Sequence, residues 1–462
     1  MQRSQKMAKA SCLCDGMLET ESSKGACSIT RIETAAENGA ANILERILDR
    51  DNLNRAYQKV KKKGGSAGID GMTVEEMLPY LKEHGGELIE ALQSGRYKPK
   101  AVKRVEIPKP DGGKRKLGVP TVIDRMIQQA IVQVLEPMYE PIFSKYSYGF
   151  RPKRSAQQAM KKAYKYYEKG YTQVVDIDLA KYFDTVNHDI LIDMLRKRIK
   201  DERVIKLIRK YLRSGVMING LTQPTEEGTP QGGNLSPLLS NIYLTAFDRM
   251  LESRGHKFVR YADDCNIYVK SRRAAERVMS NCTKFLEDKL KLKVNQAKSQ
   301  VGSPLKLKFL GFSMYKIGKS AGIRPHRQSY KKFREKIREL TNRNQARSIE
   351  MIIKRVVRYI KGWLGYFSVA NIMTKLKELN GWIRRRLRQI YWKQWKNTST
   401  RYKNLRKLEV DEDNAWKWAS SSKGYWRIAG SQVLTNTLTN AYLEAAGYVD
   451  ILKIYNKLHS SC

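Results

Sequence analysis

Two adjacent carboxylates at a predicted turn are the residues best suited to chemistry in this chain. Residues 258–270 read Phe-Val-Arg-Tyr-Ala-Asp-Asp-Cys-Asn-Ile-Tyr-Val-Lys, so Asp263 and Asp264 lie between two short runs of β-branched and aromatic residues. This pattern predicts a β-hairpin with both acids at its tip. Like charges side by side repel each other, and a bound cation relieves the repulsion. The hairpin therefore indicates a cation site.

A second acidic strand supplies a further ligand. In Val174–Leu179 the side chains of Asp176 and Asp178 share one face, because side chains alternate along a strand. Asp178, at the end of the strand, would complete an oxygen-rich site for Mg²⁺ beside the hairpin tip. Two Mg²⁺ ions about 4 Å apart can clamp the attacking and leaving oxygens of a phosphoryl transfer. The spacing alone is equally compatible with solvated acidic turns that bind no metal.

The rest of the chain is strongly basic. Its 462 residues contain 88 Lys and Arg against 46 Asp and Glu, a formal net charge of +42. Such a charge favours binding to a polyanion, first of all a nucleic acid, with strong dependence on salt. A membrane surface is the second candidate, but no apolar run of about 18 residues predicts a spanning segment. The six cysteines form no CxxC pair, which argues against zinc and suits a reducing compartment.

The hydrophobic pattern predicts helices and strands in alternation, as in an α+β domain. A β-hairpin is expected from strands 102–107 and 115–119, followed by a strand at 173–179. Helices are expected at 43–60, 74–84, 123–135, 189–213, 236–251 and 274–290. Beyond residue 326 the pattern becomes helical and basic, with 19 Lys/Arg and 4 Asp/Glu in residues 328–396. Three helices are expected there, at 328–343, 348–367 and 372–396.

Several motifs, in order, resemble those of reverse transcriptases. Tyr261–Asp264 (YADD) resembles the catalytic box of that family, and Asp178–Asp184 (DLAKYFD) resembles its first acidic motif. Pro230-Gln231-Gly232 resembles the loop between them, and Phe309–Phe312 (FLGF) a late strand of the palm. One such motif would be weak evidence, but four in the family's order make the resemblance specific.

Other segments are typical of the branch that group II introns encode. They are Ser147–Pro152 (SYGFRP), Trp382–Leu387 (WIRRRL), Trp392–Lys396 (WKQWK) and Gly424–Ile428 (GYWRI). From about residue 41 onward the chain resembles a bacterial group II intron reverse transcriptase/maturase.

The resemblance implies an α+β right-hand polymerase with fingers and palm, a helical N-terminal extension and an α-helical thumb, the maturase X domain. A small C-terminal DNA-binding module follows. The expected division is a flexible tail at 1–40, the extension at 41–100, fingers and palm at 101–325, the thumb at 326–398 and the module at 399–462.

Catalytic roles follow from the resemblance position by position. Asp178, Asp263 and Asp264 match the metal-binding catalytic aspartates, which implies two Mg²⁺ ions, with Mn²⁺ as a substitute. Asp176 matches no catalytic residue, and we interpret it as supporting charge.

The same resemblance implies a nucleotide site. Lys109 and Arg115 match residues that grip the triphosphate, a role that suits a point charge and a planar fork. Phe183 matches the aromatic residue beneath the incoming sugar, and Gln231 and Gly232 match the loop beside the nucleotide and template. The plainer alternatives are that Lys109 and Arg115 lie on a solvated face of the hairpin and that Phe183 is a packed core residue.

Basic residues elsewhere are candidate contacts to nucleic acid. They are Arg151, Lys298, Lys361, Arg384, Arg385, Arg386, Arg388 and Lys393. Four arginines spaced as in 384–388 cannot all face one way on a helix, so we expect some of them to be solvated. Lys298 is as well explained by surface charge, and the interleaved tryptophans are more often core than stacking platforms.

The functional hypothesis is an RNA-directed DNA polymerase that also binds its group II intron RNA, assists splicing and supports retrohoming. Expected partners are the intron RNA, an RNA template with a DNA primer, target DNA and dNTPs, with no membrane. We expect a cytoplasmic, nucleoid-associated bacterial protein. The sequence shows no cysteine-paired, His-rich endonuclease. The alternatives are a maturase with a dispensable polymerase site and a reverse transcriptase of a defence or CRISPR locus.

Overall fold

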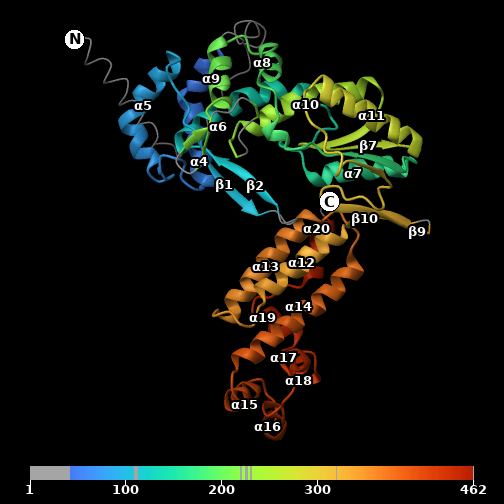
Figure 1. Ribbon diagram of the computed structural model, residues 1–462. Helices are drawn as coiled ribbons and strands as arrows, with labels where there is room; N and C mark the ends of the chain where they lie inside the picture. Colours follow the sequence, from blue (N-terminus) through green and yellow to red (C-terminus); the bar gives the residue numbers. More distant parts are fainter. Residues whose placement is uncertain are drawn as a thin grey trace, which may run out of the picture. The chain divides into compact units, whose positions relative to one another are not determined.

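A computed structural model describes residues 42–108, 113–218, 221–223, 227–228, 232–318 and 320–460. Lys109, Pro230 and Gln231 lie outside the described residues. By its internal contacts the chain divides into two units (Figure 1). One unit runs to Ser155 and resumes at Tyr171–Gly302, and the other joins Ala156–Gly170 to the chain from Ser303 onward. The expected division into five segments stays a prediction.

The first unit begins with helices. They are α3 (Ile43–Leu48), α4 (Arg50–Lys63) and α5 (Met77–Gln93). The sequence predicts one helix over 43–60, but the chain is extended at Asp49 (φ −54°, ψ 137°). The Asp49 carboxylate accepts a hydrogen bond from the Asn52 N–H at 3.1 Å and so caps α4. The predicted helix is therefore two helices, because an aspartate can begin a new one.

The expected hairpin forms a twisted ribbon. β1 (Val102–Pro108) pairs antiparallel with β2 (Lys114–Val119), with Ile107 opposite Arg115. β4 (Val216–Ile218) pairs with β1, and β5 (Leu221–Gln223) continues this sheet in the order β2-β1-β4-β5. The hairpin predicted at 102–107 and 115–119 is therefore confirmed as β1 and β2.

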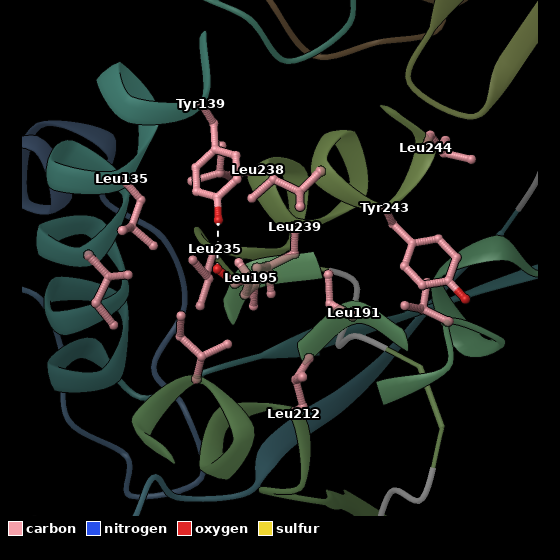
Figure 2. Packing of buried hydrophobic residues seen from close by; sticks show 14 of the residues in the cluster. Leu135, Tyr139, Leu191, Leu195, Leu212, Leu235, Leu238, Leu239, Tyr243 and Leu244 are labelled. Carbon is pink, nitrogen blue, oxygen red and sulfur yellow. Dashed lines mark hydrogen bonds between the residues drawn. The ribbon is translucent and has the colours of Figure 1, made fainter. Parts of the chain in front are cut away.

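Helices build the core behind this sheet. They are α6 (Val122–Tyr139), α8 (His188–Arg196), α9 (Glu202–Leu212) and α10 (Ser236–Ser253). Figure 2 shows leucines of these helices packed together, with the Tyr139 hydroxyl donating to the Leu195 carbonyl at 3.3 Å. The single helix expected at 189–213 is in fact α8 and α9. Asp201 ends the connection by accepting from the Arg203 N–H, which caps α9.

A four-stranded antiparallel sheet carries the acidic residues. Its strands are β6 (Lys257–Tyr261), β7 (Asp264–Val269), β3 (Gln173–Ile177) and β8 (Gln300–Gly302), in the order β6-β7-β3-β8. α11 (Arg272–Asp288) packs against β3 and β7, and α10 against β6 (Figure 1). The expected acidic hairpin is confirmed as β6 and β7.

The second unit is mainly helical. Its main elements are α7 (Ala156–Glu168), β9 (Phe312–Ile317), β10 (Ser320–Pro325), α12 (Arg327–Leu340), α13 (Ile349–Tyr366), α14 (Met373–Gln394) and α20 (Ile451–Ser460). Short helices lie between the last two: α15 (Thr398–Lys407), α16 (Glu412–Ala419), α17 (Tyr425–Ile428), α18 (Gln432–Thr437) and α19 (Asn440–Ala445). The three helices expected at 328–396 are confirmed as α12, α13 and α14. None of the described helices is long and apolar enough to cross a bilayer.

A buried ion pair anchors β6 to α10. The Arg260 side chain is 1% exposed and the Asp248 side chain 0%, and the Arg260 guanidinium donates to both Asp248 carboxylate oxygens at 2.7 and 2.6 Å. The remaining donors reach the Asn241 amide oxygen at 3.1 Å and the Ala262 carbonyl at 2.8 Å. Such a bidentate pair is stable only because each charge has its partner.

Removing one partner should therefore unfold the first unit readily. We expect Asp248→Ala to lower the free energy of unfolding by about 3–5 kcal/mol, because it leaves the Arg260 charge buried and unpaired. Urea unfolding measures this loss. Glu276→Ala is the matched control, since it breaks the exposed Arg272–Glu276 pair and should cost less than about 1 kcal/mol. Equal losses in the two variants would contradict the interpretation.

Candidate active site

Strand register brings the predicted acidic residues to one edge of the sheet. β3 and β7 are antiparallel, with Ile177 opposite Cys265. Asp178 directly follows Ile177 and Asp264 directly precedes Cys265, so the register places these two acids opposite each other. Asp263 lies in the two-residue turn between the paired Tyr261 and Asp264.

The electrostatics of Asp263 show that the acids interact. Burial raises the pKa of the Asp263 carboxyl, and the negative charge of Asp178 raises it further. The positive charges of Arg115 and Arg260 act in the opposite direction on the same pKa. Arg115 comes from β2, so the structure brings a predicted nucleotide-binding residue to the predicted catalytic pair.

Asp178 is held in place by a neighbouring loop. The Asn295 side chain donates to an Asp178 carboxylate oxygen at 3.0 Å, and the Asn295 backbone N–H donates to the Asp178 carbonyl at 2.8 Å. The Ser299 hydroxyl accepts from the Asp178 N–H at 3.1 Å. Asn295 was not among the predicted site residues. The sequence signal that could have identified Asn295 is an amide side chain shortly before β8, the strand that pairs with β3.

Asp176 faces a different partner. The Asn266 amide donates to the Asp176 carboxylate at 2.7 Å, across the β3–β7 pair. This contact lies inside the sheet and suits the interpretation of Asp176 as supporting rather than catalytic.

The hairpin tip has an unusual backbone. Ala262 adopts φ +57°, which is uncommon for a residue with a side chain and persists only where the surroundings fix it. The Arg260 bond to the Ala262 carbonyl is one such constraint. Gly149 is another, because a Cβ there would stand 2.2 Å from the Ala262 nitrogen. Only glycine therefore allows the 147–152 segment to lie against the tip.

The donor set suits a hard cation. The donors brought together are carboxylates, and oxygen ligands are those that Mg²⁺ prefers. The pKa of Asp263 is raised mainly by burial and also by the charge of Asp178, and a divalent cation would relieve both effects. Among the described residues, no three His, Cys, Asp or Glu side chains are already grouped as a complete metal site. The edge thus fits a metal ion without forming a closed cage.

Two further nucleotide-site residues lie in tight backbone packing. Gly232 has φ +120°, and a Cβ there would stand 2.4 Å from the Gly118 carbonyl oxygen of β2. Phe183 is half-buried, with its ring 5.2 Å from that of Tyr182. Its carbonyl oxygen would be 2.7 Å from a Cβ on Gly228. Lys109 and Gln231 remain outside the described residues.

Arg151 serves the structure of the first unit. Its side chain is 3% exposed and pairs with Glu140 at 2.7 Å. It also donates to the carbonyls of Ser144 at 2.6 Å and Ser147 at 2.8 Å. With its donors used in this way, Arg151 is not available as the nucleic-acid contact that we expected.

The arginines of α14 contact other parts of the protein, although Arg384, Arg385 and Arg386 are only half-buried. Arg384 pairs with Asp450 at 2.8 Å, and Arg388 is buried and donates to the Leu438 carbonyl at 2.8 Å. Arg385 lies 4.1 Å from the Trp426 ring, and Arg386 donates to the Thr341 hydroxyl at 2.5 Å. Different faces of the helix contact different protein partners, so these four side chains hold the second unit together.

The remaining basic candidates are accessible. Lys298 and Lys361 are exposed, and Lys393 is half-buried, with its ammonium 5.2 Å from the Tyr425 ring. Trp392 and Trp395 are buried in the core of the second unit, which agrees with the interpretation of these tryptophans as core residues rather than stacking platforms.

Asp263→Asn should stabilise the metal-free protein. Above its folded-state pKa the wild-type carboxyl carries a charge that burial and the Asp178 charge disfavour, and the neutral amide removes that cost. Because the folded-state pKa of Asp263 is raised, the difference should be complete above that pKa and vanish below about pH 4, where the acid is protonated in both states. Thermal unfolding above that pKa and below about pH 4 tests this, with about 2–4 °C in Tm for each kcal/mol gained. A difference that does not depend on pH would contradict it.

Comparison with family models assigns most of both units. Residues 107–314 match the reverse transcriptase (RNA-dependent DNA polymerase) model, and residues 330–409 match the maturase-specific domain of group II introns.

Similar proteins include three from distant hosts. The chain is 34% identical to protein YkfC of Escherichia coli over 52% of this chain and 73% of that protein. It is 36% identical to the group II intron-encoded protein LtrA of Lactococcus lactis, over 50% of this chain and 39% of LtrA. It is 33% identical to a putative COX1/OXI3 intron 2 protein of Saccharomyces cerevisiae, over 70% of this chain and 38% of that protein. The chain thus spans less than half the length of the last two relatives. From these matches, it belongs to the family of group II intron-encoded reverse transcriptases and maturases.

Proposed function

We propose that this protein synthesises DNA on an RNA template at the edge formed by β3 and β7, and that it also binds group II intron RNA as a splicing maturase. The observation that carries the proposal is the strand register that sets Asp178 opposite Asp264 with Asp263 in the adjoining turn, while the charge of Arg115 acts on the Asp263 carboxyl. Neither acidic turns in solvent nor a purely structural charge pair would combine two repelling acids with a cation from the β1–β2 ribbon.

Asp178, Asp263 and Asp264 would hold Mg²⁺ with their carboxylate oxygens. When bound, the metal supplies charge stabilisation for phosphoryl transfer, and Mn²⁺ would serve similarly. Asn295 fixes the orientation of the Asp178 carboxylate through its hydrogen bond. Mutation of a positioning residue of this kind commonly lowers metal affinity or activity by about 10–100-fold.

Other residues would place the nucleotide. Arg115 provides a planar donor fork for the triphosphate, with Lys109 as a second cation. Gly232 lets the backbone of its loop approach both β2 and a ligand. Phe183 would lie beneath the incoming sugar, where a 2′-hydroxyl would clash.

The charge of the chain supports nucleic-acid partners. A net charge of +42 favours intron RNA, a primed RNA template and target DNA as partners, and it supports an association with the nucleoid of a bacterial cell. Exposed Lys298 and Lys361 and half-buried Lys393 are the surface contacts that we retain from the predicted set. The match of residues 330–409 to a maturase-specific domain favours splicing assistance as a second activity, and retrohoming would use both.

Loss of the acids should separate the two activities. We expect Asp263→Asn/Asp264→Asn to abolish dNTP incorporation on a primed RNA template, because the metal ligands are gone, while intron RNA binding stays within about twofold. Primer extension and filter binding measure the two. Asp193→Asn/Asp288→Asn removes two exposed carboxylates and is the matched control, with both activities intact. Full extension by the first variant would refute the assignment, and failure of the wild type would refute the polymerase function itself.

Arg115→Gln should raise the KM for dNTPs. A charge-assisted contact to phosphate contributes about 1.5–3 kcal/mol, so we expect a rise of about 10–100-fold in steady-state extension. Lys116→Gln is the control, because neighbouring strand residues point to opposite faces of the ribbon. Equal changes in the two variants would indicate a general effect of charge rather than a nucleotide contact.

A further inference from the structure

A basic pocket lies at the end of the β6–β7 hairpin that is remote from the acidic tip. Its cavity volume is about 420 Å³. Six of the side chains that line it carry the argument: Tyr171, Arg254, His256, Lys257, Lys270 and Arg277.

The turn from α10 to β6 gathers half of these groups. α10 ends at Ser253, and Gly255 takes φ +69°, which lets the His256 N–H donate back to the Leu251 carbonyl at 3.0 Å. The chain then enters β6 at Lys257, which pairs with Tyr268 near the end of β7. Lys270 follows β7, and Arg277 adds its charge from α11.

The charge in this pocket is not neutralised by protein. No Asp or Glu lines it. Among the ion pairs of the described residues, none involves Arg254, Lys257 or Arg277. The carboxyl-terminal end of α10 accounts for Arg254, because a cation is favourable there. It does not account for Lys257 on β6, Lys270 after β7 and Arg277 on α11, whose side chains line the same cavity.

The size of the cavity narrows the ligand. A volume of 420 Å³ exceeds what one phosphate needs and falls within the range of about 300–1,000 Å³ typical of small organic ligands. Tyr171 adds an aromatic surface, with the Lys270 ammonium 5.8 Å from its ring. Cations beside an aromatic ring suit a nucleotide, whose phosphate and base need the two kinds of contact.

The pocket is separate from the predicted catalytic edge. The Lys257–Tyr268 pair and the Tyr261–Asp264 pair are four residues apart along the hairpin. At about 3.3 Å per residue, this is about 13 Å. A nucleotide in the pocket would therefore not reach Asp263 or Asp264.

We propose that this pocket binds one nucleotide of a single RNA strand, with its phosphate among Lys257, Lys270 and Arg277 and its base beside Tyr171. The proposal rests on the proposed function, because the strand is the RNA that the protein binds besides its template. RNA held at this end of the hairpin leaves the acidic tip free for a primed template.

The test measures RNA binding while the polymerase site is occupied. The full chain is saturated with an unlabelled primer–template, and a fluorescent oligoribonucleotide of about 12 nucleotides is titrated by anisotropy. Lys257→Gln/Lys270→Gln/Arg277→Gln should weaken its binding by about tenfold or more. The slope of log affinity against log salt should fall by about 0.7, because one phosphate contact is lost. Tyr171→Ala should weaken binding by about fivefold or more through loss of stacking.

The matched control removes the same charge elsewhere. Arg273→Gln/Lys284→Gln/Lys289→Gln takes three exposed cations from α11 and its end outside the pocket, and should change binding by less than about twofold. Equal weakening by both triple variants, or none by the pocket variant, would overturn the proposal. If about 10 mM inorganic phosphate displaces the oligonucleotide as fully as unlabelled RNA does, the pocket is a small-anion site and the assignment to RNA fails.

Primer extension distinguishes a failure of the RNA-pocket proposal from a failure of the proposed polymerase function. The pocket variant should extend a primed template within about twofold of wild type, because no pocket residue reaches the acidic tip. Loss of extension in the pocket variant would overturn the separation of the two sites. A wild type that binds RNA in the pocket but extends no primer would refute only the polymerase function.

Discussion

The ion pair between Arg260 and Asp248 supports everything that we assign to the acidic edge. It joins β6 to α10 in a fully buried place, and its spare donor holds the carbonyl of Ala262. In the turn that follows, Ala262 has a positive φ that a residue with a side chain rarely adopts, and Asp263 comes directly after it. A desolvated pair of this kind adds little net stability, but it tolerates only one arrangement of its neighbours. Here that arrangement is the one that sets two acids against each other.

The molecule combines opposite electrostatic demands within one unit. A chain with a large positive charge attracts phosphates everywhere, yet the edge of β3 and β7 concentrates negative charge that raises the pKa of Asp263. A bound metal ion would reconcile the two, because it would let phosphates approach carboxylates. The basic pocket at the far end of the same hairpin needs no such mediator. One pair of strands thus presents two surfaces of opposite sign to one kind of polymer.

The sequence was sufficient where local patterns decide the structure. The β6–β7 hairpin, the β1–β2 ribbon and the helices α12, α13 and α14 follow from alternation, turn residues and helical periodicity. The pattern failed at Asp49 and at 197–201, where a capping aspartate outweighed continuous apolar spacing. It also did not reveal the protein partners of the α14 arginines and of Arg151. Their charge indicated solvent or nucleic acid, whereas partners such as Asp450, Leu438 and Glu140 lie far enough along the chain that spacing does not reveal them. Asn295 and Gly149 were missed for the same reason.

The hydrogen bond from Asn295 to Asp178 spans 117 residues, and β8 must pair with β3 before that loop is in place. A ribosome synthesises the chain from its amino terminus, so Asp178 is made well before the residues that orient it. The acids cannot take up their final arrangement until about residue 302 has left the ribosome. A partly made chain therefore carries the acidic residues without their final arrangement, and the edge at which we propose catalysis forms late in biosynthesis.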